Sequence, residues 1–287
     1  MKRDVAYVRP GTLEEALYFL KEEGENSQIL AGGTDVITGL RSGTVRSGLL
    51  VDISRIPELK GIEEKEDTIC IGAGVTLSEI MTSNAVAPVA PLLQKAARVF
   101  GSTQIRNMAT IGGNICRASP AGDTLPVLYA HEAQLELISS SSLRRMLLSD
   151  FIRGPGETLL GAGELLRGIR LKKVPEFCVH QFEKVGNRKV LAVSIVSLAA
   201  LLSLDHTGII EGARLAWGSV APTVVRSTQV EQFLTGKPLT AKTLNETFPL
   251  VQEAISPIDD IRASAVYRRR VAAGLLFRLL KDREPRD

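Results

Sequence analysis

The segment GSTQIRNMATIGGNICRASPAGDTLP, residues 101–126, constrains the fold of this 287-residue chain more than any other stretch. It crowds Gly, Ser, Thr and Asn into the middle of the chain, where a domain usually places its core. Its centre, Thr110 to Asn114, carries two adjacent glycines. Glycine permits positive φ and close approach to the backbone, and consecutive amides can form an anion-binding nest. The segment therefore predicts a loop that holds a ligand through amides and small hydroxyls.

A second glycine cluster, Ala31 to Asp35 with the sequence AGGTD, lies some seventy residues earlier. Two such loops that face each other would suit a diphosphate, which one loop would only half enclose. Neither cluster matches a P-loop or the GxGxxG fingerprint of dinucleotide-binding proteins. The residues alone indicate a phosphate-containing ligand, and the alternative for each cluster is an ordinary turn.

Composition narrows the class of protein. The net charge is +3 with 23% charged residues, and aromatic residues make up 5%, so neither nucleic acid nor a membrane surface is an expected partner. Cys70, Cys116 and Cys178 form no CxxC pair, which favours reduced thiols over a disulfide framework, a zinc site or an iron–sulfur site. No apolar run is long enough to cross a bilayer, and the N-terminal residues have no signal-peptide core. We expect a cytoplasmic protein.

The periodicity of apolar residues predicts an α+β chain. Residues 12–24 form a helix that begins at Thr12, with Glu15 completing a capping box, and ends at Gly24. Residues from about 175 to 226 read as an antiparallel meander, and three helices follow. The last helix has Val266, Ala273, Leu276 and Leu280 on or near one face. The pattern of apolar residues changes near residue 173, which predicts a domain boundary there. The part of the chain before it is expected to divide into two subdomains near residue 57.

Taken together, the two glycine stretches resemble a known family. LAGGTDVITGLRSG followed by QIRNMATIGGNIC and SPAGD is similar to the FAD-binding (medium) subunit of the xanthine dehydrogenase and carbon monoxide dehydrogenase family of molybdenum hydroxylases. The resemblance covers nearly the whole chain and includes FEKVGNRK and the C-terminal stretch from LAWGSVAP to YRRRVAAGLL. Among members, the bacterial xanthine dehydrogenase FAD subunits look most similar.

The resemblance implies a fold with two domains. A flavin domain of the vanillyl-alcohol-oxidase type would span residues 1–173, with subdomains of about 1–57 and 58–173. A C-terminal domain of antiparallel sheet and helices would span 174–287.

The resemblance also implies the cofactor contacts. The loop from Ile29 to Val36, which comes first along the chain and is called the first glycine loop below, would wrap the FAD diphosphate, with Gly32, Gly33 and Thr34 closest. Thr110 to Asn114, the second glycine loop, would form a second wall, with Ser102 and Gln104 near the ring or ribityl chain. Asp123 would contact the cofactor, Leu165 or Leu166 would lie against the flavin or adenine, and Lys184 would lie near the flavin ring. The complete set is Ile29, Leu30, Ala31, Gly32, Gly33, Thr34, Asp35, Val36, Ser102, Thr110, Ile111, Gly112, Gly113, Asn114, Asp123, Leu165, Leu166 and Lys184.

Physical chemistry leaves alternatives at several of these positions. A diphosphate would repel Asp123, so that carboxylate would meet ribose hydroxyls or ring N–H groups, or else cap the helix that begins TLPVL. Lys184 at the N1–C2=O edge would stabilise anionic reduced flavin, and its alternative is an exposed lysine on a strand. Arg106 is either a diphosphate or domain-bridging contact or part of an ion pair. The run Arg268 to Arg270 reads as a solvated helix face or a subunit contact.

Other single residues read as structural. His131, His180 and His206 are scattered, and Trp217 is expected in the core. No catalytic residue and no metal ligand can be assigned.

The resemblance implies an electron-transfer role with noncovalent FAD. A large partner subunit would oxidise the substrate at a molybdenum–pterin cofactor, and a small one would relay electrons through [2Fe–2S] clusters to FAD. NAD⁺, oxygen or another acceptor would then be reduced, and xanthine or another purine is the first expectation for the substrate. The alternatives are a stand-alone flavoprotein oxidase of the same fold and a non-catalytic scaffold subunit.

Overall fold

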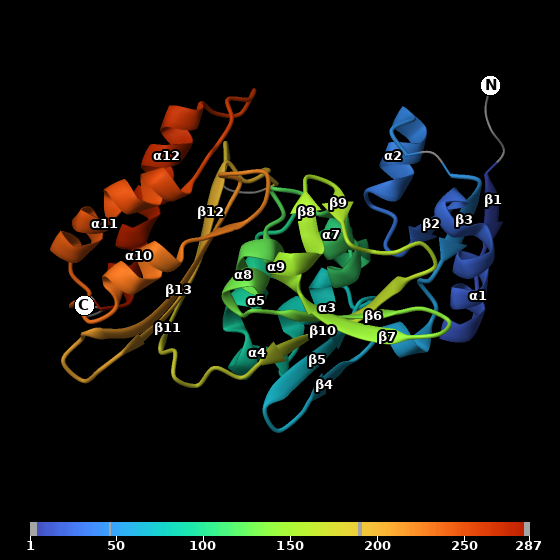
Figure 1. Cartoon of the computed structure of the whole chain (residues 1–287), viewed down its shortest axis with the longest axis horizontal. Helices are drawn as coiled ribbons and strands as arrows, with labels where there is room; N and C mark the ends of the chain where they lie inside the picture. Colours follow the sequence, from blue (N-terminus) through green and yellow to red (C-terminus); the bar gives the residue numbers. More distant parts are fainter. Residues whose placement is uncertain (1–4, 46, 189–190, 284–287) are drawn as a thin grey trace. The chain divides into compact units, whose positions relative to one another are not determined.

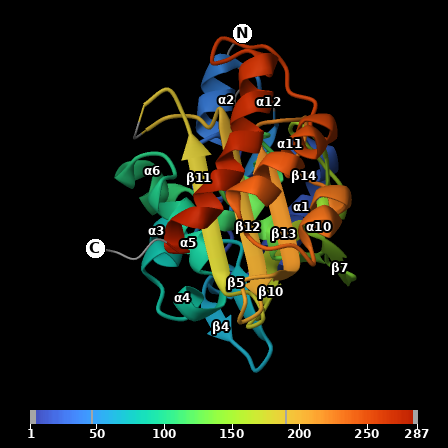
Figure 2. The same ribbon diagram turned by 90° about the vertical axis from the view of Figure 1, so that its left-hand side faces the viewer.

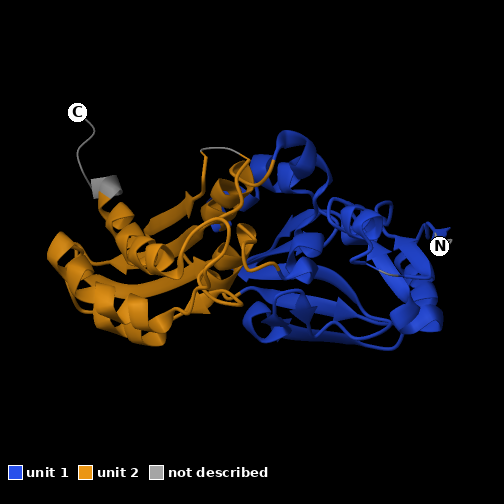
Figure 3. Ribbon diagram, turned by 90° about the horizontal axis from the view of Figure 1, so that it is seen from above, with its two compact units in different colours: residues 1–89, 102–118, 133–172 blue, residues 90–101, 119–132, 173–287 orange. Residues whose placement is uncertain are grey.

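A computed structural model describes residues 5–45, 47–188 and 191–283 (Figure 1). The chain forms two compact units, coloured separately in Figure 3. Unit 1 contains Met1–Val89, Ser102–Ala118 and Ala133–Lys172, and unit 2 contains Ala90–Gly101, Ser119–Glu132 and Lys173–Asp287. The units are therefore interleaved in sequence.

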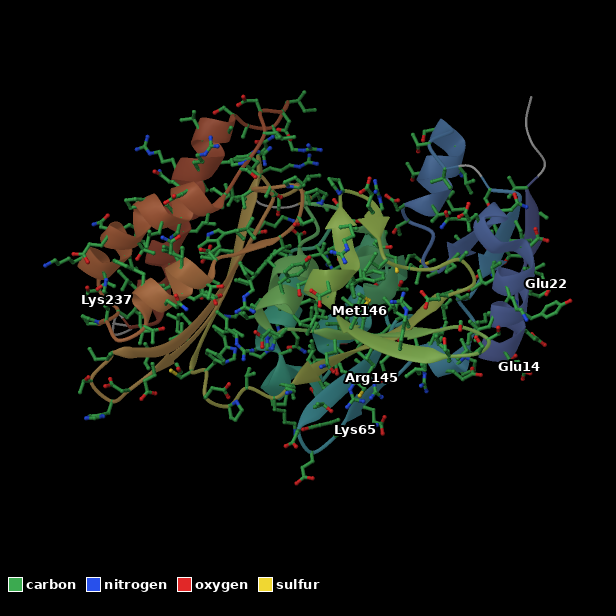
Figure 4. All side chains as sticks on the ribbon, viewed as in Figure 1. Glu14, Glu22, Lys65, Arg145, Met146 and Lys237 are labelled. Atoms are coloured by element: carbon green, nitrogen blue, oxygen red, sulfur yellow. The ribbon has the colours of Figure 1, made fainter. Side chains whose placement is uncertain are left out.

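Unit 1 begins with a small parallel sheet. Its strands β1 (Ala6–Val8), β2 (Ser27–Leu30) and β3 (Leu49–Asp52) run in the order β1–β3–β2. Helix α1 (Leu13–Glu23) packs on it, and Glu14 and Glu22 on its exposed side are labelled in Figure 4. Thr12 caps α1 as expected, but the Glu15 carboxylate accepts from the amide of Gly11 instead of completing the box.

The buried face of α1 forms the core of this part. Ala16, Leu17 and Leu20 pack with β3, and Leu165 from the second sheet joins them. Burial of such aliphatic side chains contributes about 1.5–3 kcal/mol each, so this cluster ties the two sheets of unit 1 together.

The second sheet of unit 1 is antiparallel, in the order β4–β5–β10–β6–β7. Arg145 and Met146 on β7 are labelled in Figure 4, and the Arg145 guanidinium pairs with Glu136 of β6 at 2.9 Å. The strands are β4 (Ile62–Glu64), β5 (Thr68–Gly72), β6 (Gln134–Ile138), β7 (Leu143–Leu147) and β10 (Leu165–Lys172), with the hairpin β8 (Ile152–Gly154) and β9 (Glu157–Thr158) beside them.

Short helices complete unit 1. Thr76 and Glu79 form a full capping box at the start of α3. The helices are α2 (Val36–Ser42), α3 (Leu77–Thr82), α4 (Val86–Val89), α6 (Thr103–Met108), α7 (Ile111–Arg117) and α9 (Leu148–Phe151), with 3₁₀ turns at Gly24–Asn26 and Pro57–Leu59.

Unit 2 has three layers. Figures 1 and 2 show helices α10, α11 and α12 over one face of its sheet, while α5 and α8 pack on the strands from the other side. The strands are β11 (Val179–Val185), β12 (Val196–Leu204), β13 (Ile210–Gly218) and β14 (Val225–Arg226), antiparallel in that order. The helices are α5 (Pro91–Arg98), α8 (Thr124–Ala130), α10 (Thr228–Leu234), α11 (Ala241–Ala254), α12 (Ala265–Gly274) and the 3₁₀ segment Leu275–Arg283.

The two covered faces explain the composition of β12. Residues Val196 to Ser203 are all buried, because helices cover the sheet on both sides and leave no solvent face for polar residues. Trp217 of β13 is fully buried as predicted, and its indole N–H donates to the carbonyl of Ala272 at 3.1 Å. The antiparallel meander expected from the sequence is confirmed.

The C-terminal helix differs from expectation. Regular α-helix ends at Gly274, and Val266 is 75% exposed although the sequence placed it near the apolar face. Arg268 is only 3% exposed, so the prediction of a solvated arginine run is wrong at this residue. Its guanidinium donates to the carbonyls of Ile195 and Ser219 and to Asp260, and these bonds offset part of the cost of burying the charge. None of the helices formed by the described residues has the length and hydropathy that a bilayer crossing needs.

Candidate cofactor site

The first glycine loop leaves the end of β2 and passes directly against the end of α6. A Cβ on Gly32 would lie 1.8 Å from the carbonyl oxygen of Met108, so only glycine fits there. Gly33 has a φ of +70°, a conformation that L side chains rarely adopt. The two glycines are thus needed for different reasons, one for close approach and one for the turn.

The second glycine loop lies at the start of α7. Thr110 caps this helix, and its hydroxyl accepts from the amide of Gly113 at 3.1 Å. A Cβ on Gly112 would lie 2.6 Å from the Cβ of Ala73, so this glycine lets α7 pack onto the turn after β5. The amides of Ile111 and Gly112 donate to the carbonyls of Val75 and Ala73. These amides are therefore engaged within the protein, and the second loop acts here as a scaffold.

The amides of Gly32, Gly33 and Thr34 in the first loop, unlike those of the second loop, make no hydrogen bonds to the described residues. The loop is tied to α7 by an ion pair between Asp35 and Arg117, whose carboxylate oxygen and Nε are 2.7 Å apart. Consecutive unused amides on a glycine turn suit a phosphate group, and the donor set fits the diphosphate of FAD.

The remaining contacts expected in unit 1 are partly structural. Ser102 caps α6 by accepting from the amide of Ile105, and Gln104 is exposed. Leu165 and Leu166 are both buried, and the Leu165 side chain lies in the α1 core. Ile29 and Leu30 belong to β2, Ala31 packs against that same core, Val36 begins α2, and Asn114 lies within α7.

A hollow of about 520 Å³ lies elsewhere in unit 1, beside the β6–β7 turn. Lys21, Ser139, Arg144 and Glu164 are among its lining residues, and none of the expected cofactor contacts is. Arg144 is held by Glu164 through two hydrogen bonds of 2.7 Å, which marks it as a structural residue.

Asp123 and Lys184 meet in unit 2. The Lys184 ammonium lies 2.6 Å from Oδ2 of Asp123 and also donates to the carbonyl of Val99 at 3.1 Å. Ser194 donates to Oδ1 of the same carboxylate at 2.7 Å. The trio joins the start of α8, strand β11 and the residue pair before β12.

Burial dominates the electrostatics of this trio. Desolvation raises the pKa of Asp123 above its ordinary value, while Lys184 and Ser194 oppose that rise by favouring the ionised carboxylate. Asp123 makes no capping hydrogen bond to α8, so the capping alternative is wrong. The Lys184 side chain is 11% exposed, so the alternative of an exposed strand lysine is wrong as well.

Two of these interactions had no clear signal in the sequence. Arg117 follows Gly113 by one helical turn, so its approach to the first loop could have been guessed once α7 was recognised. Ser194 lies ten residues beyond Lys184, and only the hairpin of β11 and β12 brings it to Asp123.

No group of three or more His, Cys, Asp or Glu side chains in the described residues is arranged to hold a metal ion. Cys70, Cys116 and Cys178 are free thiols.

Comparison with known proteins identifies the family. Residues 3–174 match the FAD-binding domain in molybdopterin dehydrogenase, and residues 181–282 match the CO dehydrogenase flavoprotein C-terminal domain. The chain is a FAD-binding subunit of the molybdenum hydroxylase family. The domain matches support FAD as its cofactor, and molybdopterin and iron–sulfur clusters belong to partner subunits in this family.

Individual relatives of this FAD subunit have different substrates. It is 33% identical to the glyceraldehyde dehydrogenase medium chain of Sulfolobus acidocaldarius, over 97% of this chain and 98% of that one. It is 32% identical to the xanthine dehydrogenase FAD-binding subunit of Escherichia coli O157:H7, over 92% and 90%. The structure of carbon monoxide dehydrogenase from Hydrogenophaga pseudoflava matches with a TM-score of 0.91, 29% identity and 96% coverage of each chain. These similarities show that the chain is an oxidoreductase subunit and show its fold. The relatives act on different substrates at similar sequence identity, so the similarities do not single out one substrate.

Proposed function

We propose that this FAD subunit receives electrons from [2Fe–2S] clusters of a partner chain and passes them to NAD⁺. FAD, when bound, supplies both one-electron and two-electron chemistry. The protein contributes binding, placement and electrostatics. The unused amides of the first glycine loop are the observation that carries this proposal, because they give the chain a phosphate-binding element of its own.

In this proposal the two glycine loops have different tasks. The amides of Gly32, Gly33 and Thr34 bind the diphosphate. The second loop, Thr110 to Asn114, holds the end of α6 and the start of α7 in place as the supporting wall. Because the Asp35–Arg117 pair is neutral overall, the loop binds the anion through dipoles more than through net charge.

Lys184 supplies the positive charge in the proposed mechanism. Its ammonium is fixed by Asp123 and the Val99 carbonyl, so its position costs little reorganisation when negative charge develops nearby. We propose that it faces the N1–C2=O edge of the flavin ring, with Asp123 keeping it protonated. No side chain is assigned as a general base, since electron transfer of this kind needs none on this subunit.

Three further assignments stay proposals. We propose xanthine or another purine as the substrate of the complex, with the xanthine dehydrogenase relative as support. We propose that the sequence divides into two domains, residues 1–173 and 174–287, and the family matches to residues 3–174 and 181–282 support this boundary. We propose a cytoplasmic location, where the three free thiols would stay reduced.

The test uses the complex assembled from this chain and its own iron–sulfur and molybdenum subunits. Anaerobic xanthine should bleach the flavin absorption, and NAD⁺ should restore it. Heat denaturation should release the flavin into solution, because we expect noncovalent binding. An assembled complex without flavin would contradict the electron-transfer role. Bleaching by an aldehyde or carbon monoxide instead would change only the substrate.

A further inference from the structure

Large apolar side chains lie exposed on a short stretch of unit 2, between α11 and the first turn of α12. Ile261 is 99% exposed, Val266 75% and Ile258 70%, and Tyr267 is also exposed. We call Ile258, Ile261, Val266 and Tyr267 the isoleucine face. Side chains of this size gathered over ten residues of surface are typical of a protein-interaction site.

The backbone beneath the isoleucine face is held in place. Asp260 accepts from the amides of Arg262 and Ala263 at 2.8 and 3.1 Å, and Asp259 accepts from the amide of Ala265 at 2.6 Å. The amide of Ser256 donates to the carbonyl of Val220 at 3.0 Å. A loop fixed in this way presents its apolar side chains in one arrangement, so a partner pays little ordering entropy when it binds.

The buried guanidinium of Arg268 anchors the same loop to the sheet. It donates to Oδ1 of Asp260 at 2.7 Å and to the carbonyls of Ile195 and Ser219, which flank strands β12 and β13. The isoleucine face is therefore an extension of the unit 2 core and does not depend on an independently folded segment.

Charge favours one kind of partner. The stretch from Ile258 to Arg270 contains two aspartates and four arginines, so it is net positive. Asp259 accepts from the loop backbone, and Asp260 pairs with both Arg262 and Arg268. Arg269 and the exposed Arg270 therefore supply the excess positive charge. Two copies of this face would repel each other, and a surface with an acidic rim would be attracted.

We propose that the isoleucine face docks a partner subunit of the hydroxylase complex, through an apolar surface with an acidic rim on that subunit. This inference rests on the proposed assembly with iron–sulfur and molybdenum chains. It adds which surface of this chain makes the contact and what chemistry the other side presents.

The test compares variants of the full chain that are co-expressed with its own iron–sulfur and molybdenum subunits. The double variant Ile258→Ser with Ile261→Ser should assemble at least about tenfold more weakly, since exposed apolar anchors carry most of the affinity at such interfaces. Tyr18→Ser on α1 of unit 1 is the control, because Tyr18 is a comparably exposed apolar residue at 59%. Native mass spectrometry reports the assembled fraction.

Two readouts separate lost docking from lost folding. The fluorescence of Trp217 should show an unchanged unfolding transition in the double variant, because both isoleucines are exposed, and FAD content should match that of the wild type. Arg270→Glu should weaken assembly and lower its dependence on salt, as expected when an attractive rim charge is reversed.

Equal assembly of the double variant and the wild type would overturn the proposal. So would a wild-type dimer of this chain that the double variant abolishes, or wild-type binding to phosphatidylserine vesicles that the same variant removes. Those results would assign the face to a second copy or to a lipid surface. A complex that assembles through the isoleucine face but lacks flavin would contradict the proposed function and leave the docking inference intact.

Discussion

Replacing His131 should make unit 2 more resistant to acid. His131 follows α8 and is 1% exposed, and neither of its ring nitrogens has a hydrogen-bond partner among the described residues. Burial lowers the pKa of His131 from 6.5 to about 4, with smaller contributions from the neighbouring His180 and Arg214. The folded protein therefore holds this imidazole neutral at pH values where the unfolded chain would protonate it.

The sign follows from proton linkage. The folded-state pKa lies below the unfolded value, so stability is retained above the unfolded pKa of 6.5 and falls as the pH drops toward about 4. At 1.36 kcal/mol per pKa unit, the loss between about pH 7.5 and about pH 5 is about 2 kcal/mol. His131→Leu removes this loss and breaks no hydrogen bond to the described residues. Its free energy of unfolding, relative to the wild type, should rise by that amount between the two pH values.

The assay is urea denaturation of the FAD-free chain, followed by tryptophan fluorescence. Trp217 is the single tryptophan and is buried in unit 2, so its signal reports the unit that contains His131. His206→Gln is the control, because His206 is exposed at the β12–β13 turn and should give the same difference from wild type at both pH values. If the His131→Leu difference is independent of pH, or if His206→Gln changes as much, the argument from burial is refuted.

Three other substitutions test the packing and the charges. Gly32→Ala should abolish FAD binding and destabilise unit 1, because the added Cβ would collide with the backbone at the end of α6. Gly274→Ala is the control and should be neutral, because its Cβ would meet no atom within 4 Å. Flavin absorbance measures the binding and thermal melting measures the stability of both variants. Ser194→Ala should raise the pKa of the buried Asp123 further, because it removes a donor to the ionised carboxylate, and Ser194→Thr should restore it. Carbon-13 NMR titration of the Asp123 carboxyl measures this, and equal pKa values in the three proteins would contradict the role of this hydroxyl. Arg268→Met should cost about 1–3 kcal/mol of unfolding free energy, because it leaves the carbonyls of Ile195 and Ser219 without their donor and removes one of the partners of Asp260. Arg270→Met should stay within about 0.5 kcal/mol in the same urea titration.

Local features of the fold could be predicted from the sequence. The cap at Thr12 and the meander of unit 2 depend on neighbouring residues and on side-chain period. The final helix was predicted less well. The apolar spacing there did not reveal that Val266 stays exposed while Arg268 is buried, because that choice depends on carbonyls from distant loops.

The candidate site shows the same limit. The glycines of both loops marked a ligand site, and the long motif identified the cofactor. The sequence did not distinguish the free amides of the first loop from the engaged amides of the second. The turn after β5 accepts hydrogen bonds from the amides of Ile111 and Gly112, whereas the amides of Gly32 to Thr34 donate to none of the described residues.

The sequence by itself determined the two glycine loops, the first helix and the antiparallel meander, because each is encoded in residues close along the chain, and the resemblance of its long motif to a known family gave the cofactor class. The tertiary structure alone decided that Ala90–Gly101 and Ser119–Glu132 join unit 2, and that Ser194 reaches Asp123. These depend on contacts between residues far apart in sequence. Burial and the pairing of buried charges decide which of these contacts form. The periodicity of apolar residues along the chain does not show which distant residue a buried polar group will contact.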